Sequence, residues 1–481
     1  MEAKKDFTLL RSAYDAEAFR HLGHQLIDLL ADHVGAAHTG ALDKTIPYRS
    51  PDAELLFWQD DFSAGTGDAL GFFDALIGHS IRLHHPGYIG HQVSVPAMTA
   101  SLAGLVSDVL SNGTGVYEMG MASNAIERIV TDFTAAKVGY PATANGHITS
   151  GGTLANLTAL LAARQAKAPT PVWEEGNDQR LAVLVSEEAH YCIDRAVRIM
   201  GWGAEGIIKM PVDEQFRLRT DLLPQYYQEA IDKGLLPIAV VGCAGSTSTG
   251  SYDDLEAVAD FCEQYNLWFH ADGAHGGAVV FSPLYRHLAK GMERADSVVI
   301  DYHKMLMTPA LNTALLFREG HLAYHTFSQR AQYLWENTPD PEWYHSGKRT
   351  FECTKLMMSI KVYALLRTYG EALFAENIER LHESASLLAN MIADHPDFEL
   401  AVVPSSNIVN FRFIPCPVAR RDEVNEAIRQ RLLASGAFYI VQTTLRNERY
   451  LRCSVMNPFT DSRTFQSLLE ECSRYGREMA G

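Results

Sequence analysis

Five short, almost uninterrupted apolar runs constrain most strongly what this chain can fold into. They lie at residues 181–186, 238–243, 267–270, 297–300 and 314–317. Runs of this kind are typical of strands in a parallel sheet that is covered on both faces, because such strands meet no water on either side. Helical patterns lie between them, for example at residues 154–168 and 253–265. From residue 84 to about residue 365 the alternation therefore predicts an α/β fold.

The two ends of the chain have a different texture. From residue 16 to residue 34, apolar side chains recur at helical spacing, which predicts an amphipathic helix in a segment too small to fold alone. After residue 367, helical patterns at 371–393 and 423–433 alternate with strand-like runs, as in a small α+β domain. These runs lie at 407–413, 438–441 and 450–454. We expect an N-terminal helical segment (1–83), a large α/β domain (84–366) and a small C-terminal domain (367–481).

Charge and composition exclude several classes of partner. The formal net charge of −17 argues against binding to nucleic acid or to an anionic membrane surface. No apolar run reaches the roughly 18 residues that would span a bilayer, and residues 1–6 lead into a polar segment, so we expect a cytoplasmic protein. Seven cysteines without a C-x-x-C pair favour reduced thiols over disulfides or a metal site.

A lysine follows the fourth apolar run, in the segment Asp301-Tyr302-His303-Lys304. The apolar residues next to it, among them Met305 and Leu306, predict surroundings that disfavour the ammonium form, and a neutral amine is a nucleophile. A lone lysine at a strand end more often extends into solvent. Its interpretation therefore depends on what else lies at the same edge of the sheet.

The segment Ser150-Gly151-Gly152-Thr153 leads directly into the helical pattern at 154–168. Free N–H groups and the helix dipole favour a phosphate at such a helix start, with the Thr153 hydroxyl as a further donor. A plain turn capped by Thr153 explains the segment equally well. The Ser/Thr-rich turn around Thr247, after the second run, is likewise either a phosphate contact or a solvated turn.

Two further residues follow strands at this predicted edge, where open α/β sheets bind their ligands. Asp272 either caps the next turn or holds a protonated heteroaromatic nitrogen, with Ala274 leaving room for a flat ring. His190 follows the first run. A phosphate cradle, an acid, an aromatic-facing histidine and a strand-end lysine, in this chain order, together fit pyridoxal 5′-phosphate carried by Lys304 as a Schiff base.

With these motifs in place, the sequence resembles the group II pyridoxal-phosphate-dependent amino acid decarboxylases, which include the aromatic amino acid, glutamate, cysteine sulfinate and diaminobutyrate enzymes. The resemblance extends from His84-His85-Pro86-Gly87-Tyr88 to Arg452-Cys453-Ser454-Val455-Met456-Asn457-Pro458. It implies fold type I, with a mainly parallel seven-stranded large domain and a smaller α+β C-terminal domain. It also implies an obligate homodimer, embraced by the N-terminal segment, with its active sites at the interface.

The resemblance also implies a role for each site residue. Asp272 would pair with the pyridinium nitrogen, His190 would stack on the ring and Ala274 would pack against its other face. The phosphate would be surrounded by Gly152, Thr153, Thr247 and His303. Tyr88, His91 and Tyr333 would lie on the substrate side.

The reaction so implied is α-decarboxylation of an L-amino acid to a primary amine and CO2, through the Lys304 Schiff base and a quinonoid intermediate. Tyr333 would return a proton from a lid at residues 328–348, unless it is an ordinary loop aromatic. The family pattern is not kept throughout, since Gly87 stands where an arginine is frequent and His275 where tryptophan or tyrosine is common. His91 and His275 either favour an acidic substrate side chain or are satisfied structural histidines. The substrate therefore stays open.

Three alternatives remain at this stage. An oxidative decarboxylase-deaminase would make an aldehyde, but that chemistry is associated in the family with a changed loop tyrosine or stacking histidine, and Tyr333 and His190 are both present. An aminotransferase is disfavoured because no match to its carboxylate-binding arginine is found. A catalytically silent relative would keep the fold without the reaction.

Overall fold

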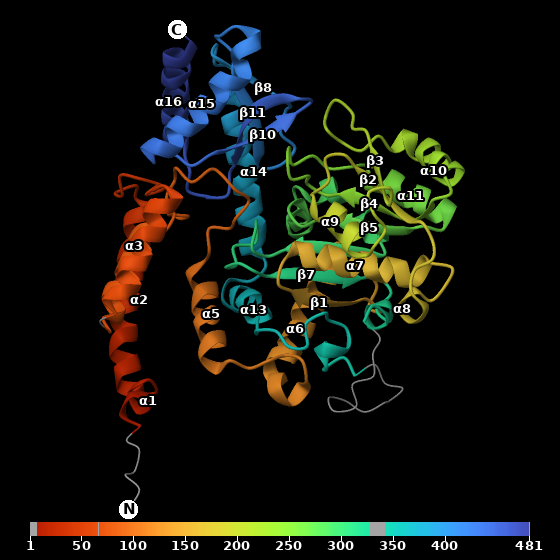
Figure 1. Ribbon diagram of the computed structural model, residues 1–481, viewed down its shortest axis with the longest axis horizontal. Coiled ribbons are helices and arrows are strands. Elements are labelled where there is room, and N and C mark those ends of the chain that lie inside the picture. Colours follow the sequence, from red (N-terminus) through yellow and green to blue (C-terminus); the bar gives the residue numbers. More distant parts are fainter. Residues whose placement is uncertain (1–6, 66, 328–341, 481) are drawn as a thin grey trace, which may run out of the picture.

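A seven-stranded sheet organises the centre of the molecule (Figure 1). The computed structural model describes residues 7–65, 67–327 and 342–480. The strand order in the sheet is β1-β7-β6-β5-β4-β2-β3. The strands are β1 (Asn145–Thr149), β2 (Leu181–Ser186), β3 (Ile207–Met210), β4 (Leu236–Cys243), β5 (Trp268–Asp272), β6 (Ser297–Asp301) and β7 (Thr313–Phe317). All five strands predicted from apolar runs are confirmed, while β1 and β3 carry charged or polar residues that hid them.

The sheet is parallel from β3 to β6, and β7 runs antiparallel to both β6 and β1. Every residue of β7 is nevertheless buried. The apolar run at 314–317 therefore indicated burial on both faces, not strand direction. The predicted α/β fold is confirmed.

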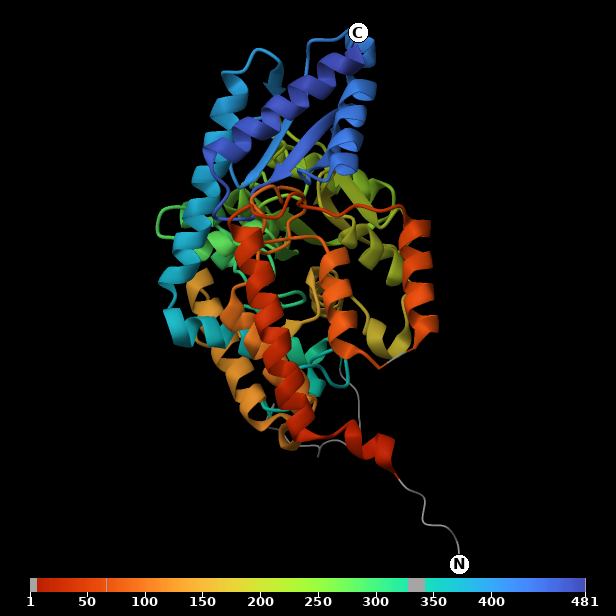
Figure 2. The same cartoon turned by 90° about the vertical axis from the view of Figure 1, so that its left-hand side faces the viewer.

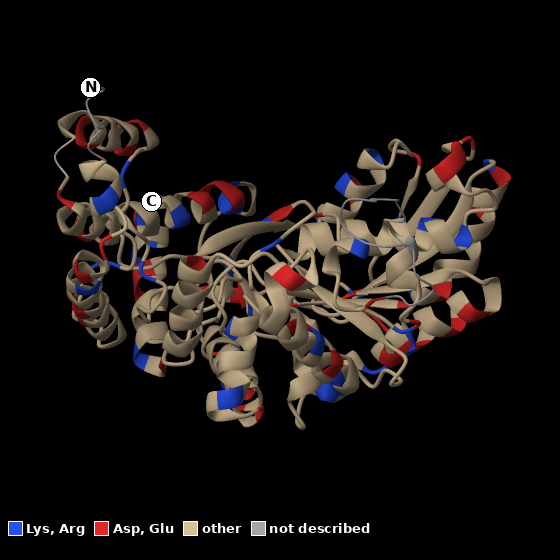
Figure 3. Ribbon diagram, turned by 90° about the horizontal axis from the view of Figure 1, so that it is seen from below, with Lys and Arg blue, Asp and Glu red and all other residues tan. Residues whose placement is uncertain are grey.

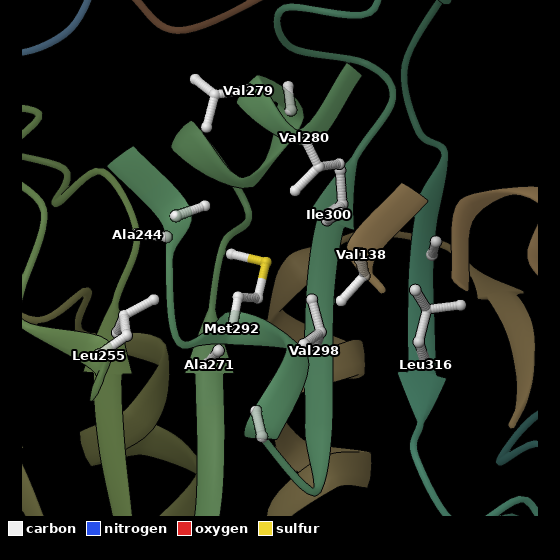
Figure 4. Packing of buried hydrophobic residues seen from close by; sticks show 14 of the residues in the cluster. Val138, Ala244, Leu255, Ala271, Val279, Val280, Met292, Val298, Ile300 and Leu316 are labelled. Atoms are coloured by element: carbon white, nitrogen blue, oxygen red, sulfur yellow. The ribbon is translucent and has the colours of Figure 1, made fainter. Parts of the chain in front are cut away.

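Helices cover both faces of this sheet. On one face, α7 (Gly152–Lys167) and α9 (Cys192–Ile199) pack against alternate strand residues such as Val185 and Val299. On the other face, Val298 and Ile300 belong to a second buried cluster that includes Val138 (Figure 4).

The remaining helices are α1 (Thr8–Ser12), α2 (Ala16–His38), α3 (Pro51–Ala64), α4 (Ala69–His79), α5 (Met98–Leu110), α6 (Tyr117–Val138), α8 (Val172–Glu175), α10 (Leu223–Asp232), α11 (Leu255–Tyr265), α12 (Leu322–His325), α13 (Ser359–Tyr369), α14 (Ala372–Ala393), α15 (Arg421–Ser435) and α16 (Ser462–Ala480). Short 3-10 helices lie at Thr220–Leu222, Gly276–Phe281, Arg286–Ala289, Met292–Arg294, Ser346–Lys348 and Val418–Arg420.

A second, antiparallel sheet lies near the C-terminus, with α14, α15 and α16 beside it (Figure 2). Its order is β10-β11-β9-β8, with β8 (Phe398–Leu400), β9 (Ile408–Phe413), β10 (Val441–Leu445) and β11 (Glu448–Ser454). The strand predicted at 438–441 was largely wrong, because β10 begins only at Val441. Instead, the backbone of Tyr439 bonds to Gly87 and Ile89, so this apolar run joins the C-terminal sheet to the segment that precedes α5.

The N-terminal helices stand away from the large sheet (Figures 1 and 3). The predicted amphipathic helix is confirmed as α2, which begins where the Asp15 carboxylate accepts a hydrogen bond from the Ala18 N–H at 2.7 Å. Basic and acidic residues are interspersed along the ribbon in Figure 3. None of the helices in the described ranges is long and apolar enough to cross a membrane.

Candidate active site

A cavity of about 300 Å³ lies at the carboxyl ends of β2, β4, β5 and β6, next to the start of α7. Parallel strands bring these ends to one edge of the sheet, as expected from sequence. The predicted residues that line it are Gly152, Thr153, His190, Thr247, Asp272, Ala274, His303 and Lys304. Tyr88 and His91 do not line it, and Tyr333 lies outside the described residues.

The amine of Lys304 lies against a carboxylate. Its Nζ is 2.8 Å from Oδ2 of the buried Asp301, and Nε2 of His303 is 3.6 Å from the same oxygen. Thr313 donates to the other oxygen at 2.5 Å. Burial raises the pKa of Asp301, but Lys304 and His303 outweigh it and hold that pKa below its usual value.

The sequence predicts apolar surroundings for the Lys304 amine, but the amine instead contacts the charged carboxylate of Asp301. Met305 and Leu306 are fully buried in a hydrophobic cluster, and neither lines the cavity. Sequence reasoning missed Asp301 as a site residue. Its position three residues before Lys304, at the end of an apolar strand, was the available signal.

Helix α7 begins at the cavity with two glycines. Gly151 has φ 128° and ψ 158°, a conformation open almost only to glycine. A Cβ on Gly152 would lie 3.3 Å from Asp301 Oδ1, closer than such contacts usually are. The first helical turn leaves backbone N–H groups without helical partners, and these can bind an anion.

Asp272 ends β5 with both carboxylate oxygens engaged by uncharged donors. Oδ2 accepts from Nδ2 of Asn156 at 3.2 Å, and Oδ1 accepts from the Ala274 N–H at 3.1 Å. Among the described residues no cation pairs with Asp272. The carboxylate therefore keeps acceptor capacity for a protonated ring nitrogen.

His190 is held in one tautomer. Its Nδ1 accepts the backbone N–H of Cys192 at 3.2 Å, which leaves the ring proton on Nε2. Burial lowers the pKa of His190, although Asp272 acts in the opposite direction. A neutral, flat ring is suited to stacking on another aromatic ring.

Beside the first cavity lies a second one of about 320 Å³, and the two share His190, Tyr191 and Thr247. Arg452 of β11 lines this second cavity and is only 6% exposed. Its Nη2 donates to Gln92 Oε1 at 2.8 Å, and no carboxylate in the described part of the chain pairs with it. Burial lowers the pKa of Arg452 to about 10. Sequence reasoning missed this residue, although an arginine within the buried strand at 450–454 was a signal.

Of the two histidines considered for substrate binding, His275 lines the first cavity and is otherwise buried. Its Nε2 lies 2.7 Å from Asn407 Oδ1, and burial lowers its pKa to about 3. His91 lies close enough to Arg452 for that charge to act with burial in lowering the pKa of His91. Tyr88 donates weakly to the His91 carbonyl at 3.4 Å. His91 therefore lies near Arg452 and Tyr88 lies next to His91, and neither residue lines the first cavity.

The residues present fit pyridoxal phosphate. At the start of α7, the absence of a side chain on Gly152 leaves space for a phosphate that a Cβ would reduce. Asp272 is a buried acceptor with no cationic partner among the described residues, and Lys304 lines the same cavity. The ring and the phosphate of the cofactor need these three features at one site.

Known proteins with similar sequences and structures include amino acid decarboxylases. A family model described as the pyridoxal-dependent decarboxylase conserved domain matches residues 84–414. The chain is 26% identical over 474 residues to aromatic-L-amino-acid decarboxylase of Bacillus atrophaeus, covering 97% of each. It is 27% identical over 446 residues to aspartate 1-decarboxylase of Aliivibrio fischeri, covering 83% of this chain and 81% of the relative. The crystal structure of mouse CSAD superposes with a TM-score of 0.89 at 25% identity, covering 96% of this chain and 99% of that one.

Proposed function

Because the chain belongs to the pyridoxal-dependent decarboxylase family, we propose that it catalyses α-decarboxylation of an L-amino acid to a primary amine and CO2. Membership makes it a pyridoxal-phosphate-dependent carboxy-lyase of fold type I. The observation that carries the proposal is the meeting of Lys304, Asp272 and His190 around the cavity at the start of α7.

Bound pyridoxal phosphate supplies an electron sink for the electron pair left behind when the carboxylate departs. Lys304 provides the amine that carries the cofactor, and Asp301 holds that amine whenever it is free. Asp272 would keep a proton on the ring nitrogen, and His190 and Ala274 would pack on the two faces of the ring. Gly152, Thr153, Thr247 and His303 would hold the phosphate.

The carbon that loses CO2 must then gain a proton. We assign this step to Tyr333, and the exclusion of water to residues 328–348, on the resemblance set out above. Retention of Tyr333 and His190 favours amine over aldehyde as the product. A product assay separates the two, because aldehyde formation also releases ammonia.

The substrate proposed is an amino acid with an acidic side chain. A buried guanidinium without a carboxylate partner is costly, and a substrate anion would relieve that cost. The α-carboxylate is the poorer candidate for this contact, since it loses its charge as CO2 and a firm ion pair would stabilise the ground state over the transition state. A second carboxylate or a sulfinate on the side chain has no such conflict.

We further propose an obligate homodimer in the cytoplasm, divided as residues 1–83, 84–366 and 367–481, with the first part embracing the partner. Large apolar side chains are exposed along α1, α3 and α5. All seven cysteines are free thiols, in keeping with a reducing compartment. We also propose that Tyr88 and His91 lie on the substrate side, which is supported by the proximity of His91 to Arg452 and by the contact of Tyr88 with the His91 carbonyl.

The test is a panel of amino acids scored for CO2, amine, aldehyde and ammonia. The panel includes aspartate, glutamate, cysteine sulfinate, 2,4-diaminobutyrate and the aromatic amino acids. We expect amine and CO2 in equal amounts from an acidic member, and none from Lys304→Ala. The exposed Lys290→Ala should behave as wild type. Absence of CO2 from every amino acid with cofactor bound would refute the proposed function.

Arg452→Gln tests the substrate class. Losing a charged contact to the substrate should lower kcat/KM for the acidic substrate by roughly 100-fold, with little change for an apolar amino acid. Arg449→Gln, which changes a more exposed arginine of the same strand, is the matched control and should keep the wild-type preference. An equal loss on all substrates would instead place Arg452 at the α-carboxylate or in the structure.

A further inference from the structure

Three large polar side chains alternate along β5 on the face that α7 covers (Figure 1). Trp268, His270 and Asp272 occupy every second position of the strand, so they point to the same side of the sheet. All three are buried. Only Asp272 reaches the cavity, so the two side chains behind it have no role in the site described so far.

Hydrogen bonds join these side chains into one chain through Ser297 of β6 and Asn156 of α7. Trp268 Nε1 donates to Ser297 Oγ at 2.9 Å, and Ser297 Oγ lies 2.8 Å from His270 Nδ1. His270 Nε2 lies 2.6 Å from Asn156 Oδ1. Asn156 Nδ2 then donates to Asp272 Oδ2 at 3.2 Å.

The two ends of this chain fix its direction. The indole N–H of Trp268 can only donate, and an ionised Asp272 can only accept. Ser297 therefore accepts from Trp268 and donates to His270 Nδ1. The remaining ring proton of His270 sits on Nε2 and is donated to Asn156, which turns the Asn156 amide nitrogen toward Asp272. Nδ2 of Asn156 also donates to Cys192 Sγ at 3.3 Å, so the amide has a partner for every polar hydrogen.

A neutral His270 is required for this order, because a protonated ring would have no acceptor to offer Ser297. Burial lowers the pKa of His270 to about 4, so that the ring is neutral at physiological pH. Reversal of the chain would place Asn156 Oδ1 against the Asp272 carboxylate, and two acceptors would then repel each other.

We propose that Trp268, Ser297, His270 and Asn156 form a directed relay that positions the Asp272 carboxylate as an acceptor for the ring nitrogen of the cofactor. The inference rests on the cofactor role proposed for Asp272. His270 does not line the cavity, whereas Asn156 lines it and its amide donates to Asp272. Both residues act on the cofactor through Asp272 and are therefore positioning residues in this relay. The relay makes the strength of the ring-nitrogen contact depend on an indole located at the opposite end of β5.

The experiment compares four variants of the full-length protein. His270→Phe removes the donor to Asn156, whereas His270→Gln keeps an acceptor toward Ser297 and a donor toward Asn156. Trp268→Phe removes the first donor only. Trp202→Phe is the matched control, since Trp202 is a buried tryptophan of the same hydrophobic cluster whose indole nitrogen has no partner among the described residues.

Two readouts are independent of turnover: the dissociation constant of pyridoxal phosphate, and the 15N NMR shift of cofactor labelled at the ring nitrogen, which reports its protonation. For His270→Phe we expect a dissociation constant raised about tenfold or more and a shift toward the unprotonated ring. Trp268→Phe should change both readouts in the same direction as His270→Phe but to a smaller extent. Asp272 alone still favours the same donor-to-acceptor direction along the remaining hydrogen bonds. His270→Gln and Trp202→Phe should match wild type.

A purely structural network gives a different result. In that case thermal stability falls in His270→Phe and Trp268→Phe while both readouts stay at wild-type values, and the relay is refuted. If His270→Phe does not fold, the comparison of Trp268→Phe with Trp202→Phe decides, and equal readouts for that pair refute the relay. Failure to decarboxylate any amino acid, with these readouts as expected, would refute the proposed function and leave the relay standing.

Discussion

His190, Asp272 and Lys304 line one cavity in the folded protein, because each follows a strand that ends at the same edge of the large sheet. The apolar runs that precede these residues predict this meeting. Asp301 was missed although its partner Lys304 lies only three residues later, whereas Arg452 was missed because the residue it contacts is distant in the sequence. Arg452 is 360 residues away from Gln92, its one side-chain hydrogen-bond partner in the described ranges, so the sequence carries no local signal of that contact.

His275 provides a test of burial at the residue scale. Its pKa is about 3 in the folded protein and near 6.5 when unfolded. Between these values only the unfolded chain binds the proton, so stability is complete above pH 6.5 and is lost as the pH falls toward 3. At pH 5 the loss is about 2 kcal/mol. Urea unfolding of the apoprotein at pH 7.5 and 5.0 should show a smaller drop in the free energy of unfolding for His275→Gln than for wild type. His287→Gln, a change at an exposed histidine, should show the same drop as wild type. Equal drops in all three would contradict the assignment.

At the scale of elements, periodicity located strands and helices well but did not give strand direction or the ends of elements. The apolar run of β7 matched those of its parallel neighbours because both faces are covered alike. The run at 438–441 is apolar because the backbone of Tyr439 is hydrogen-bonded to Gly87 and Ile89 in a buried segment, not because a strand of the sheet lies there. The start of α7 was found two residues late, since glycines are poor helix formers in isolation.

That start of α7 is open to a test by substitution. Gly151→Ala places a side chain at φ 128°, ψ 158°, which should destabilise the protein by roughly 1–3 kcal/mol and displace the first turn. We expect a lower melting temperature and a weaker affinity for pyridoxal phosphate. Gly23→Ala is the control, because Gly23 lies within α2 with open space around its Cα, and it should be neutral or slightly stabilising. Unaltered cofactor affinity in Gly151→Ala would argue against a phosphate cradle there.

At the scale of the whole molecule, the arrangement of large sheet, smaller sheet and N-terminal helices leaves an apolar surface that the described part of the chain does not cover. On α5 the residues Leu102, Leu105, Val106, Val109 and Leu110 are each at least 46% exposed. Their spacing places them along one side of the helix. Contiguous apolar surface of this kind marks an interface with another protein, and the proposed homodimer accounts for it.

Sedimentation analysis tests this dimer directly. The wild-type protein should sediment at about twice its chain mass of 53.3 kDa at micromolar concentration. Leu105→Glu combined with Val109→Glu places two charges on the surface of α5, which should shift the protein toward monomer and weaken cofactor binding if the sites lie at the interface. Val418→Glu introduces the same charge at an exposed valine of the C-terminal part and should stay dimeric. A monomeric wild type, or a double variant that remains dimeric with full cofactor affinity, would place the interface elsewhere or remove it, because no dimer that buries α5 tolerates two unpaired carboxylates there.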